Sequence, residues 1–183
     1  MVFDTETTGL DTECDDVVQI AGVRIVRDRY VRGDTFNSLV EPGRPIPAAS
    51  TKVHGITDEQ VQGAPKFETA CLDFANFAEG SVLVAHNASF DMAFLKRFEE
   101  TGGPRFEQPV LCTARLSARL DNHTNDHTLD ALARRYGVSI DDVDRHTALG
   151  DAKATAQVFL KMLPVLADHE VQSLDDALEF QRQ

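Results

Sequence analysis

Apolar residues near the start of the chain fall into short runs that predict strands. Residues 17–26 are rich in Val and Ile, as is typical of a strand, and residues 35–40 form a second run with mixed alternation. Residues 27–33 are mostly polar and end in Gly, which predicts the turn between these two runs. A short apolar stretch at residues 1–4 precedes both, so the first three strands are expected to form a meander.

The middle of the chain alternates between helical and strand patterns. Apolar residues recur at helical spacing over residues 66–79, and the continuous apolar run at residues 81–85 predicts a strand that is buried on both faces. Ser89 is the expected N-cap of the next helix, whose apolar face includes Phe94. Residues 109–112 predict the last short strand.

The rest of the chain is expected to be mainly helical. Further helices are predicted at residues 48–61 (short turns, with Thr57 as a cap), 113–120, 128–136, 146–163 and 174–180. Pro164 is expected to end or to kink the long helix that opens at His146. His123 and His127 are interpreted as surface histidines of a polar loop, and residues 141–144 as a solvated acidic turn.

Length and composition fit one globular domain. A chain of 183 residues can enclose one well-buried core, and its 42% of hydrophobic and 26% of charged residues are ordinary for a soluble protein. Its three cysteines are odd in number and far apart, which fits neither a disulfide framework nor a zinc site. The sequence has no leader-like segment and no apolar run of membrane length. We therefore expect a cytoplasmic protein without a membrane partner.

The net charge restricts how this chain can bind nucleic acid. At a formal charge of -12, the protein lacks the excess of Lys and Arg that gives tight, nonspecific binding to a polyanion. If the substrate is nucleic acid, metal ions and local basic patches must overcome the overall field. Binding is then expected to be weak and sensitive to salt.

Two carboxylates, Asp4 and Glu6, stand where the first apolar stretch ends. Side chains two residues apart in a strand point to the same side, so both carboxylates are expected to project into one small volume. Like charges held so close repel each other, and a cation between them removes that repulsion. The pair alone is equally compatible with a solvated acidic turn, so the rest of the chain has to decide.

Two further carboxylates and a histidine occupy comparable positions later in the chain. Asp91 follows the apolar run at residues 81–85, and Asp151 lies in the last long helix, with His146 about one turn before it. Asp91 alone is equally compatible with a carboxylate that complements a helix dipole. Four convergent carboxylates, however, can hold two Mg²⁺ or Mn²⁺ ions roughly 4 Å apart, an arrangement that assists phosphodiester hydrolysis. We assign His146 as the general base, because imidazole exchanges protons at neutral pH.

Three segments of the chain carry a family resemblance. Residues 4–9 (DTETTG), 86–91 (HNASFD) and 146–152 (HTALGDA) resemble, in this order, the motifs of the DEDD superfamily of 3'→5' exonucleases, histidine subclass. This superfamily includes the proofreading epsilon subunit of bacterial DNA polymerase III. Residues 53–57 (VHGIT) resemble a segment that is often found between the first two motifs. The match spans residues 2–163, which is nearly the whole chain.

The resemblance implies an α/β fold of the ribonuclease H-like type, a mixed five-stranded sheet with one antiparallel strand, flanked by helices. It implies an exonuclease domain over residues 1–166, with residues 167–183 as a C-terminal extension or a connection to a further region. It also implies His146 as the general base of a reaction that releases nucleoside 5'-monophosphates. The implied metal ligands are Asp4, Glu6, Asp91 and Asp151.

Four more residues lie where members of the family contact the terminal nucleotide. They are Thr7, Leu10, His54 and Phe90. From the residues alone, Leu10 and Phe90 are equally compatible with ordinary packing, and His54 with a histidine that stabilises a turn. Asn87 is expected to organise its loop.

The expected substrate is the 3' end of nucleic acid, in the first place single-stranded DNA. The same site could trim RNA ends, or the chain could be a noncatalytic binding module of a polymerase or repair assembly. The lead-in to Asp4 is shorter than the central strand usual in the family. We therefore expect this to be a domain of a larger protein, with a polymerase as a possible partner.

Overall fold

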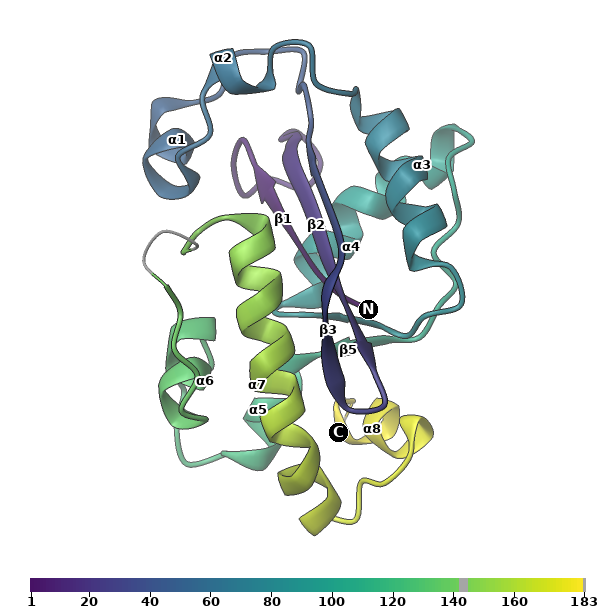
Figure 1. The fold of residues 1–183 in the computed structure, drawn as a ribbon, viewed down its shortest axis with the longest axis vertical. Helices are drawn as coiled ribbons and strands as arrows, with labels where there is room; N and C mark the ends of the chain where they lie inside the picture. The colour runs from purple at the N-terminus through teal and green to yellow at the C-terminus, as the bar shows by residue number, and fades with distance from the viewer. Residues whose placement is uncertain (142–144, 183) are drawn as a thin grey trace.

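The chain builds a five-stranded sheet with the strand order β3-β2-β1-β4-β5 (Figure 1). The computed structural model describes residues 1–141 and 145–182. The strands are β1 (Val2–Thr7), β2 (Val17–Val26), β3 (Arg29–Leu39), β4 (Leu83–Ala85) and β5 (Val110–Cys112). Strand β2 runs antiparallel to both of its neighbours, while β1, β4 and β5 are parallel to one another. The predicted mixed sheet with one antiparallel strand is therefore confirmed.

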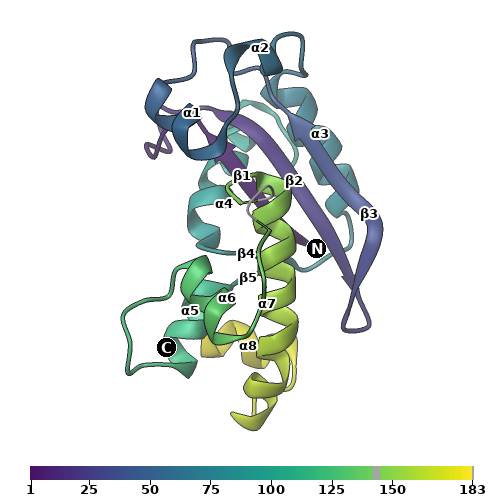
Figure 2. The ribbon, with the colours of Figure 1, turned by 60° about the vertical axis from the view of Figure 1, so that its left-hand side comes forward.

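Helices cover both faces of this sheet. They are α1 (Ala48–His54), α2 (Asp58–Val61), α3 (Phe67–Ala78), α4 (Ala88–Arg97), α5 (Thr113–Leu120), α6 (Leu129–Arg135), α7 (Ala148–Asp168) and α8 (Leu174–Phe180), with a 3-10 turn at Glu99–Thr101. Val2 packs in one cluster with Ala152 and Ala156 of α7, whereas Phe3 packs in another cluster with side chains of α3 and α4. Since neighbouring strand residues point to opposite faces, α7 covers one face and α3 with α4 the other (Figure 2).

The first hairpin differs from its prediction. Strand β3 begins at Arg29, so the turn consists of Arg27 and Asp28 alone, and the predicted turn over residues 27–33 is wrong. Both turn residues have positive φ values, 51° and 58°, which match the right-handed twist of the strands in a two-residue turn. Gly33 stays within the strand at a φ of 84°, where an irregularity in the pairing accommodates it.

The first strand is longer than its apolar stretch. Strand β1 continues to Thr7, so Asp4 and Glu6 lie within it. The prediction that they stand at the end of the strand is therefore wrong. They pair opposite Ala21 and Gln19 of β2, whose backbone provides hydrogen-bonding partners well beyond the apolar residues. Tertiary pairing thus outweighs the low strand preference of acidic residues.

The ends of α4 and α7 also correct the predictions. Asn87, at a left-handed φ of 57°, occupies the N-cap position of α4, so the assignment of Ser89 as the cap is wrong. Asn tolerates this conformation better than most residues. Helix α7 begins after its cap Thr147, not at His146, and continues through Pro164 to Asp168. Pro164 therefore does not end the helix.

The two loops that were interpreted as polar surface have different outcomes. His123 is exposed, and His127 is half-buried, with ring nitrogens 2.9 Å from Ser117 Oγ and 2.9 Å from the carbonyl oxygen of Thr124. Both nitrogens of His127 are thus engaged within the protein. Of the predicted acidic turn, residues 142–144 lie outside the described residues.

The C-terminal segment packs against the sheet. Helix α8 contacts α5 and β5, and its Ala177 is buried. The side-chain amide of Gln181 accepts a hydrogen bond from Cys112 N and donates one to the carbonyl oxygen of Val110, both at 2.9 Å. The division of the chain at residue 166 remains a prediction. Within the described ranges, the helices are too short or too polar to cross a membrane.

Phe74 lies at the centre of the core between α3 and the sheet. Its ring is fully buried, with the centroids of Phe3 and Phe36 at 5.4 and 5.6 Å. We expect Phe74→Ala to lower the free energy of unfolding by about 3–5 kcal/mol, because truncation leaves a cavity. Leu72→Ala, on the exposed side of the same helix, is the matched control and should change it by less than about 1 kcal/mol. Urea denaturation followed by circular dichroism measures both, and equal stabilities would contradict this core.

Candidate active site

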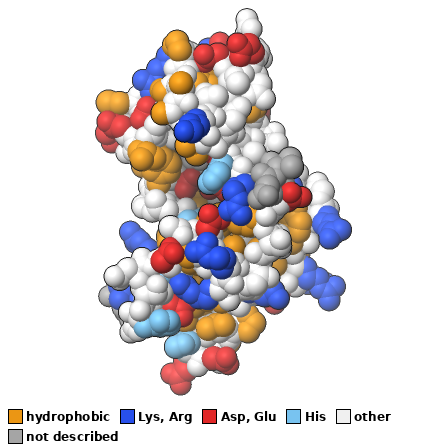
Figure 3. All heavy atoms as spheres, turned by 90° about the vertical axis from the view of Figure 1, so that its left-hand side faces the viewer, with side chains coloured by type: hydrophobic (Ala, Val, Ile, Leu, Met, Phe, Trp, Pro, Cys, Tyr) orange, Lys and Arg blue, Asp and Glu red, His pale blue; other side chains and the backbone are white. Residues whose placement is uncertain are grey.

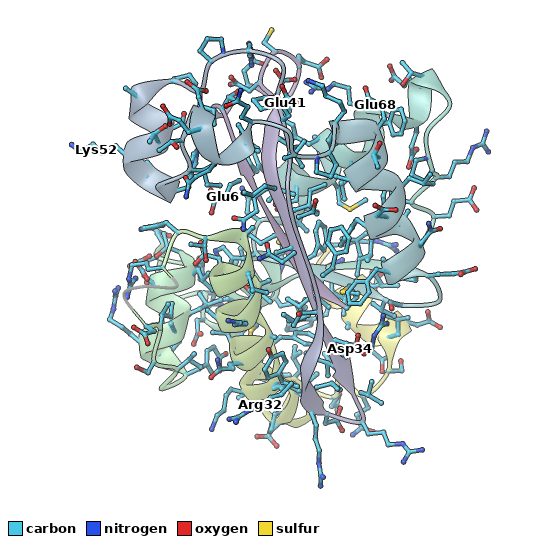
Figure 4. All side chains as sticks on the ribbon, turned by 45° about the horizontal axis from the view of Figure 1, so that its top comes forward. Glu6, Arg32, Asp34, Glu41, Lys52 and Glu68 are labelled. Carbon is cyan, nitrogen blue, oxygen red and sulfur yellow. The ribbon has the colours of Figure 1, made fainter. Side chains whose placement is uncertain are left out.

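Three carboxylates meet on the face of the sheet that α7 covers. Asp4 and Glu6 are two residues apart on β1 and share the side of Val2, which packs against α7. Asp151 lies in the first turn of α7. One carboxylate oxygen from each of the three lies within 4.8 Å of the other two. Figure 4 shows Glu6 between α1 and the green N-terminal end of α7.

A fourth carboxylate, Asp91, reaches the same place from the helix layer on the other face. Strand β4 ends at Ala85, so beyond this level β1 has no neighbouring strand on that side. The Oδ1 atom of Asp91 fills the gap by accepting hydrogen bonds from Thr5 N at 3.0 Å and Thr5 Oγ1 at 2.7 Å. Burial is the main cause that raises the pKa values of Asp4 and Glu6, and repulsion from Asp91 adds to it. The structure thus brings three of the four predicted carboxylates within 4.8 Å of one another, and it binds the fourth, Asp91, to the residue between Asp4 and Glu6.

Burial, together with mutual repulsion, raises the pKa values of these carboxylates. Burial, followed by repulsion from Asp151 and Asp91, raises the pKa of Glu6 to about 8. Burial raises the pKa of Asp91 to about 7, although the hydrogen bonds from Thr5 act in the opposite direction. The pKa of Asp4 is raised well above its ordinary value, mainly by burial. Concentrated hard oxygen donors with raised pKa values fit divalent cations of the Mg²⁺ and Mn²⁺ type.

His146 lies next to this cluster. It precedes the cap of α7, has a left-handed φ of 56°, and exposes its side chain. Burial raises the pKa of Asp151, while the charge and the backbone of His146 lower it in part. Figure 3 shows this face hollowed between the two halves of the molecule, with acidic side chains inside and histidine, basic and hydrophobic side chains around them.

A cavity of about 430 Å³ opens beside Glu6. All four predicted substrate contacts line it, namely Thr7, Leu10, His54 and Phe90. Leu10 is 86% exposed, whereas the half-buried Phe90 stands edge-on to Phe94 with ring centroids 5.2 Å apart. Val53 of α1, 59% exposed, also lines this cavity and was not predicted. The sequence gives one signal for Val53, which is its position directly before His54.

The ring of His54 is oriented by its own turn. Its Nδ1 accepts a hydrogen bond from Ile56 N at 3.0 Å, so the proton of the neutral ring is on Nε2. Nε2 is buried and makes no hydrogen bond of ordinary geometry within the described part of the chain. Burial lowers the pKa of His54, while the backbone of Thr7 acts in the opposite direction. The turn-stabilising role is thus real, and Nε2 is buried behind the wall of the cavity.

A larger cavity, of about 540 Å³, lies at the opposite end of β1. Met1, Val26 and Phe159 are among the apolar residues that line it. Within the described residues, the group of three carboxylates that could bind a metal belongs to the other end of the strand. The smaller cavity is therefore the one next to chemically useful groups.

Comparison with known proteins identifies the family. A model of the exonuclease family matches residues 1–159. This chain belongs to the exonuclease family. It is 56% identical over 167 residues to a DNA polymerase III subunit epsilon-like protein of Rhodobacter capsulatus. This alignment covers 91% of the present chain and 24% of the relative. It is also 40% identical over 176 residues to a DNA polymerase III PolC-type protein of Caldanaerobacter subterraneus, and that alignment covers 96% of the present chain and 12% of the relative.

Solved structures agree with this assignment. Exonuclease X, in complex with 5' overhanging duplex DNA, superimposes with a TM-score of 0.77 at 25% identity and covers 98% of both chains. The nuclease domain of 3'hExo, a DEDDh family member bound to rAMP, gives a TM-score of 0.75 over 90% of both chains, and at 19% identity it supports the fold alone. With the family match and the Rhodobacter relative, the predicted family and enzyme class, a 3'→5' exonuclease, are confirmed, and this family uses divalent metal ions. The chain spans about a quarter or less of the length of its two polymerase relatives.

The raised pKa values predict how stability depends on pH. An unfolded carboxyl group loses its proton near pH 4, whereas the folded protein keeps those of Glu6 and Asp91 until about pH 8 and 7. Protonation of these two groups therefore contributes its full stabilisation to the metal-free protein below about pH 4. This contribution to the free energy of unfolding is lost as the pH rises toward about 8. Metal binding displaces the same protons, so metal affinity should rise over this range.

We expect Mg²⁺ to raise the Tm of the exonuclease domain more at pH 8 than at pH 6. Thermal unfolding with EDTA and with saturating Mg²⁺ at both pH values measures this difference. Glu6→Gln should raise the Tm in EDTA at pH 8, because it removes one of the repelling charges, and should reduce the gain from Mg²⁺. Glu68→Gln, on α3, is the control. Equal gains at both pH values would contradict the proposed proton displacement.

Proposed function

We propose that this chain hydrolyses the last phosphodiester bond at the 3' end of single-stranded DNA and releases nucleoside 5'-monophosphates. The observation that supports this most is the meeting of Asp4, Glu6 and Asp151 within 4.8 Å, beside a cavity of about 430 Å³. The cavity is within the range of volumes that hold small ligands. Its exposed apolar rim and its acidic wall suit a nucleotide base and a metal-bridged phosphate, respectively.

Asp4, Glu6, Asp91 and Asp151 are the proposed ligands of two Mg²⁺ or Mn²⁺ ions. Such ions would supply positive charge that polarises the phosphodiester and stabilises the charge that develops on its oxygens. The chain's own contribution is to hold the ligands still. Asp91 is fixed by its two hydrogen bonds to Thr5, and Asp151 by its place in the first turn of α7.

His146 is the proposed general base. Its exposed ring at the edge of the cluster can take the proton of the attacking water onto an imidazole nitrogen. His146 directly precedes the cap of α7, the helix whose first turn carries Asp151. The exposed position also lets the proton pass to solvent.

The terminal nucleotide is proposed to occupy the cavity beside Glu6. Leu10 and Val53 supply exposed apolar surface for the base, with Phe90 as a more fixed wall. His54 lines the same cavity, and its hydrogen bond from Ile56 N fixes the ring there. The hydroxyl group of Thr7 already donates to the carbonyl oxygen of Gly9 at 2.6 Å, which leaves its oxygen as an acceptor.

DNA and a polymerase are the proposed substrate and partner. Both polymerase relatives are named for DNA polymerase III and are several times longer than this chain, and the structure of Exonuclease X contains DNA. We therefore propose that the domain works within or beside a DNA polymerase. The net charge of -12 makes unassisted binding weak, which favours delivery of the 3' end by a partner.

A strand-shortening assay tests the proposed reaction. A 5'-labelled DNA strand with a free 3' end should shorten stepwise in Mg²⁺, whereas a 3'-blocked strand should stay intact. Asp4→Asn and His146→Ala should reduce the rate by roughly 10²–10⁴-fold, because each removes a group that assists the reaction. Asp73→Asn and His123→Ala, at exposed positions, are the matched controls. Equal digestion of the blocked strand, or full activity of Asp4→Asn, would overturn the proposal, and faster digestion of RNA would reassign the substrate.

Leu10 tests the nucleotide pocket. We expect Leu10→Ala to raise KM by roughly tenfold with a smaller change in kcat, because it removes about 1–2 kcal/mol of apolar contact with the substrate. At 86% exposure, the side chain contributes little to folding. Val26→Ala, 47% exposed at the far end of the sheet, is the control. An unchanged KM in both variants would remove Leu10 from the binding site.

A further inference from the structure

The first turn of α7 is held to the sheet by a side chain. Backbone N–H groups at a helix start have no acceptor within the helix. Thr147 Oγ1 accepts one of them, from Gly150 N at 3.0 Å. Ala148 N instead donates to Gln19 Oε1 of strand β2 at 3.0 Å. Since Ala148 is fully buried, water cannot take the place of this acceptor.

Gln19 belongs to the same row of side chains as the carboxylates. It lies directly opposite Glu6 in the β1–β2 pairing and is 8% exposed. Its Nε2 donates to Asn37 Oδ1 of β3 at 2.9 Å. Asn37 pairs opposite Ala21, two residues along β2, so it lies on the same face of the sheet as Gln19. The row runs across three strands below the start of α7.

The donors and acceptors in this row permit one orientation of the Gln19 amide. A backbone N–H can only donate, so the carbonyl oxygen of Gln19 has to face Ala148. The amino group then faces Asn37, which accepts its proton. The N–H of Ala148 thus keeps the Gln19 amide from turning over, and Asn37 accepts from the amino group that this orientation turns toward it.

Packing alone constrains the first turns of α7 along the helix axis weakly. The fully buried residues there are small, among them Ala148, Ala152 and Ala156, whereas the larger Leu149 and Phe159 are only partly buried against the sheet. Small side chains let a helix lie close to a sheet but interlock little with it. A directional hydrogen bond at the first residue of the helix supplies the missing constraint.

We propose that Gln19, which is also bonded to Asn37, is a positioning residue that sets the start of α7 and thereby places Asp151 and His146 against Asp4 and Glu6. Asp151 follows Ala148 by three residues, and His146 precedes it by two. A displacement of about 1 Å in a catalytic group can reduce a rate by about 10²-fold. This assignment rests on the proposed roles of Asp151 and His146.

A purely structural cap makes a different prediction. If Gln19 only stabilises α7, its loss lowers the Tm but leaves kcat per folded molecule unchanged. If Gln19 positions the helix, kcat falls at temperatures where the variant is fully folded, while KM for the strand changes little because the nucleotide cavity lies on β1, α1 and α4.

Three variants separate these cases. Gln19→Met keeps the shape and removes both hydrogen bonds, and we expect its kcat to fall about 10- to 100-fold with KM within about threefold. Gln19→Glu keeps an acceptor for Ala148 N, and Asn37 can rotate its amide to donate to it. Leu166→Ala destabilises the far end of α7, where Leu166 is buried, and should leave kcat unchanged.

Amide hydrogen exchange in the metal-free protein gives a readout that does not depend on activity. Exchange of the Ala148 amide, followed by NMR, should accelerate by about tenfold or more in Gln19→Met, and remain slow in Gln19→Glu and Leu166→Ala. Slow exchange in Gln19→Met, or fast exchange with kcat intact, would overturn the positioning role. Failure of the proposed function has a different signature, because His146→Ala would then be as active as the wild type. A dead His146→Ala beside a fully active Gln19→Met overturns the positioning role alone.

Discussion

Mutual repulsion among Asp4, Glu6, Asp91 and Asp151 is the constraint on which the rest of the structure depends. Burial raises the pKa values of all four, and repulsion within the group raises those of Asp4 and Glu6 further. The folded chain therefore holds a site that costs free energy when no cation is bound. The surrounding fold has to supply that free energy. Strand β1 can bear it because it lies inside the sheet, with β2 and β4 on its two sides. Val2 and Phe3, just before the carboxylates, are fully buried on opposite faces.

The two helix layers hold the carboxylates against one another from opposite sides of β1. Helix α4 is tied to the loop after β1 by Arg97, whose guanidinium donates to the carbonyl oxygens of Thr12, Glu13 and Asp15. The same arginine pairs with Asp16 at 3.2 Å, so the helix that carries Asp91 offsets part of the negative charge of this loop. Helix α7 is tied to β2 at its first residue by Gln19. Rigid attachment of both helices keeps the ligands close although their charges repel.

Predictions that rest on local sequence patterns are confirmed, whereas those that depend on tertiary contacts are wrong or missing. The helix over residues 66–79 and the strand over residues 17–26 are confirmed, because their periodicity depends on residues a few positions apart. The turn over residues 27–33 and the cap at Ser89 are wrong. In both places the backbone adopts left-handed conformations at Arg27, Asp28 and Asn87, which strand pairing and helix docking impose. Thr5, Gln19 and Val53 were missed at the site, because their roles depend on partners far away in the sequence.

By itself, the sequence determined the chemical identity of the site: the acidic residues, the histidine one turn before the last of them, and the family to which their spacing belongs. Residue type and short spacing are local properties, and they survive without knowledge of the fold. Only the tertiary structure decided how the groups meet. It shows that β4 ends early enough for Asp91 to bind Thr5, and that the buried N–H of Ala148 finds its acceptor 129 residues away in Gln19. Such contacts join distant segments through hydrogen bonds that burial makes obligatory, and no local pattern encodes them.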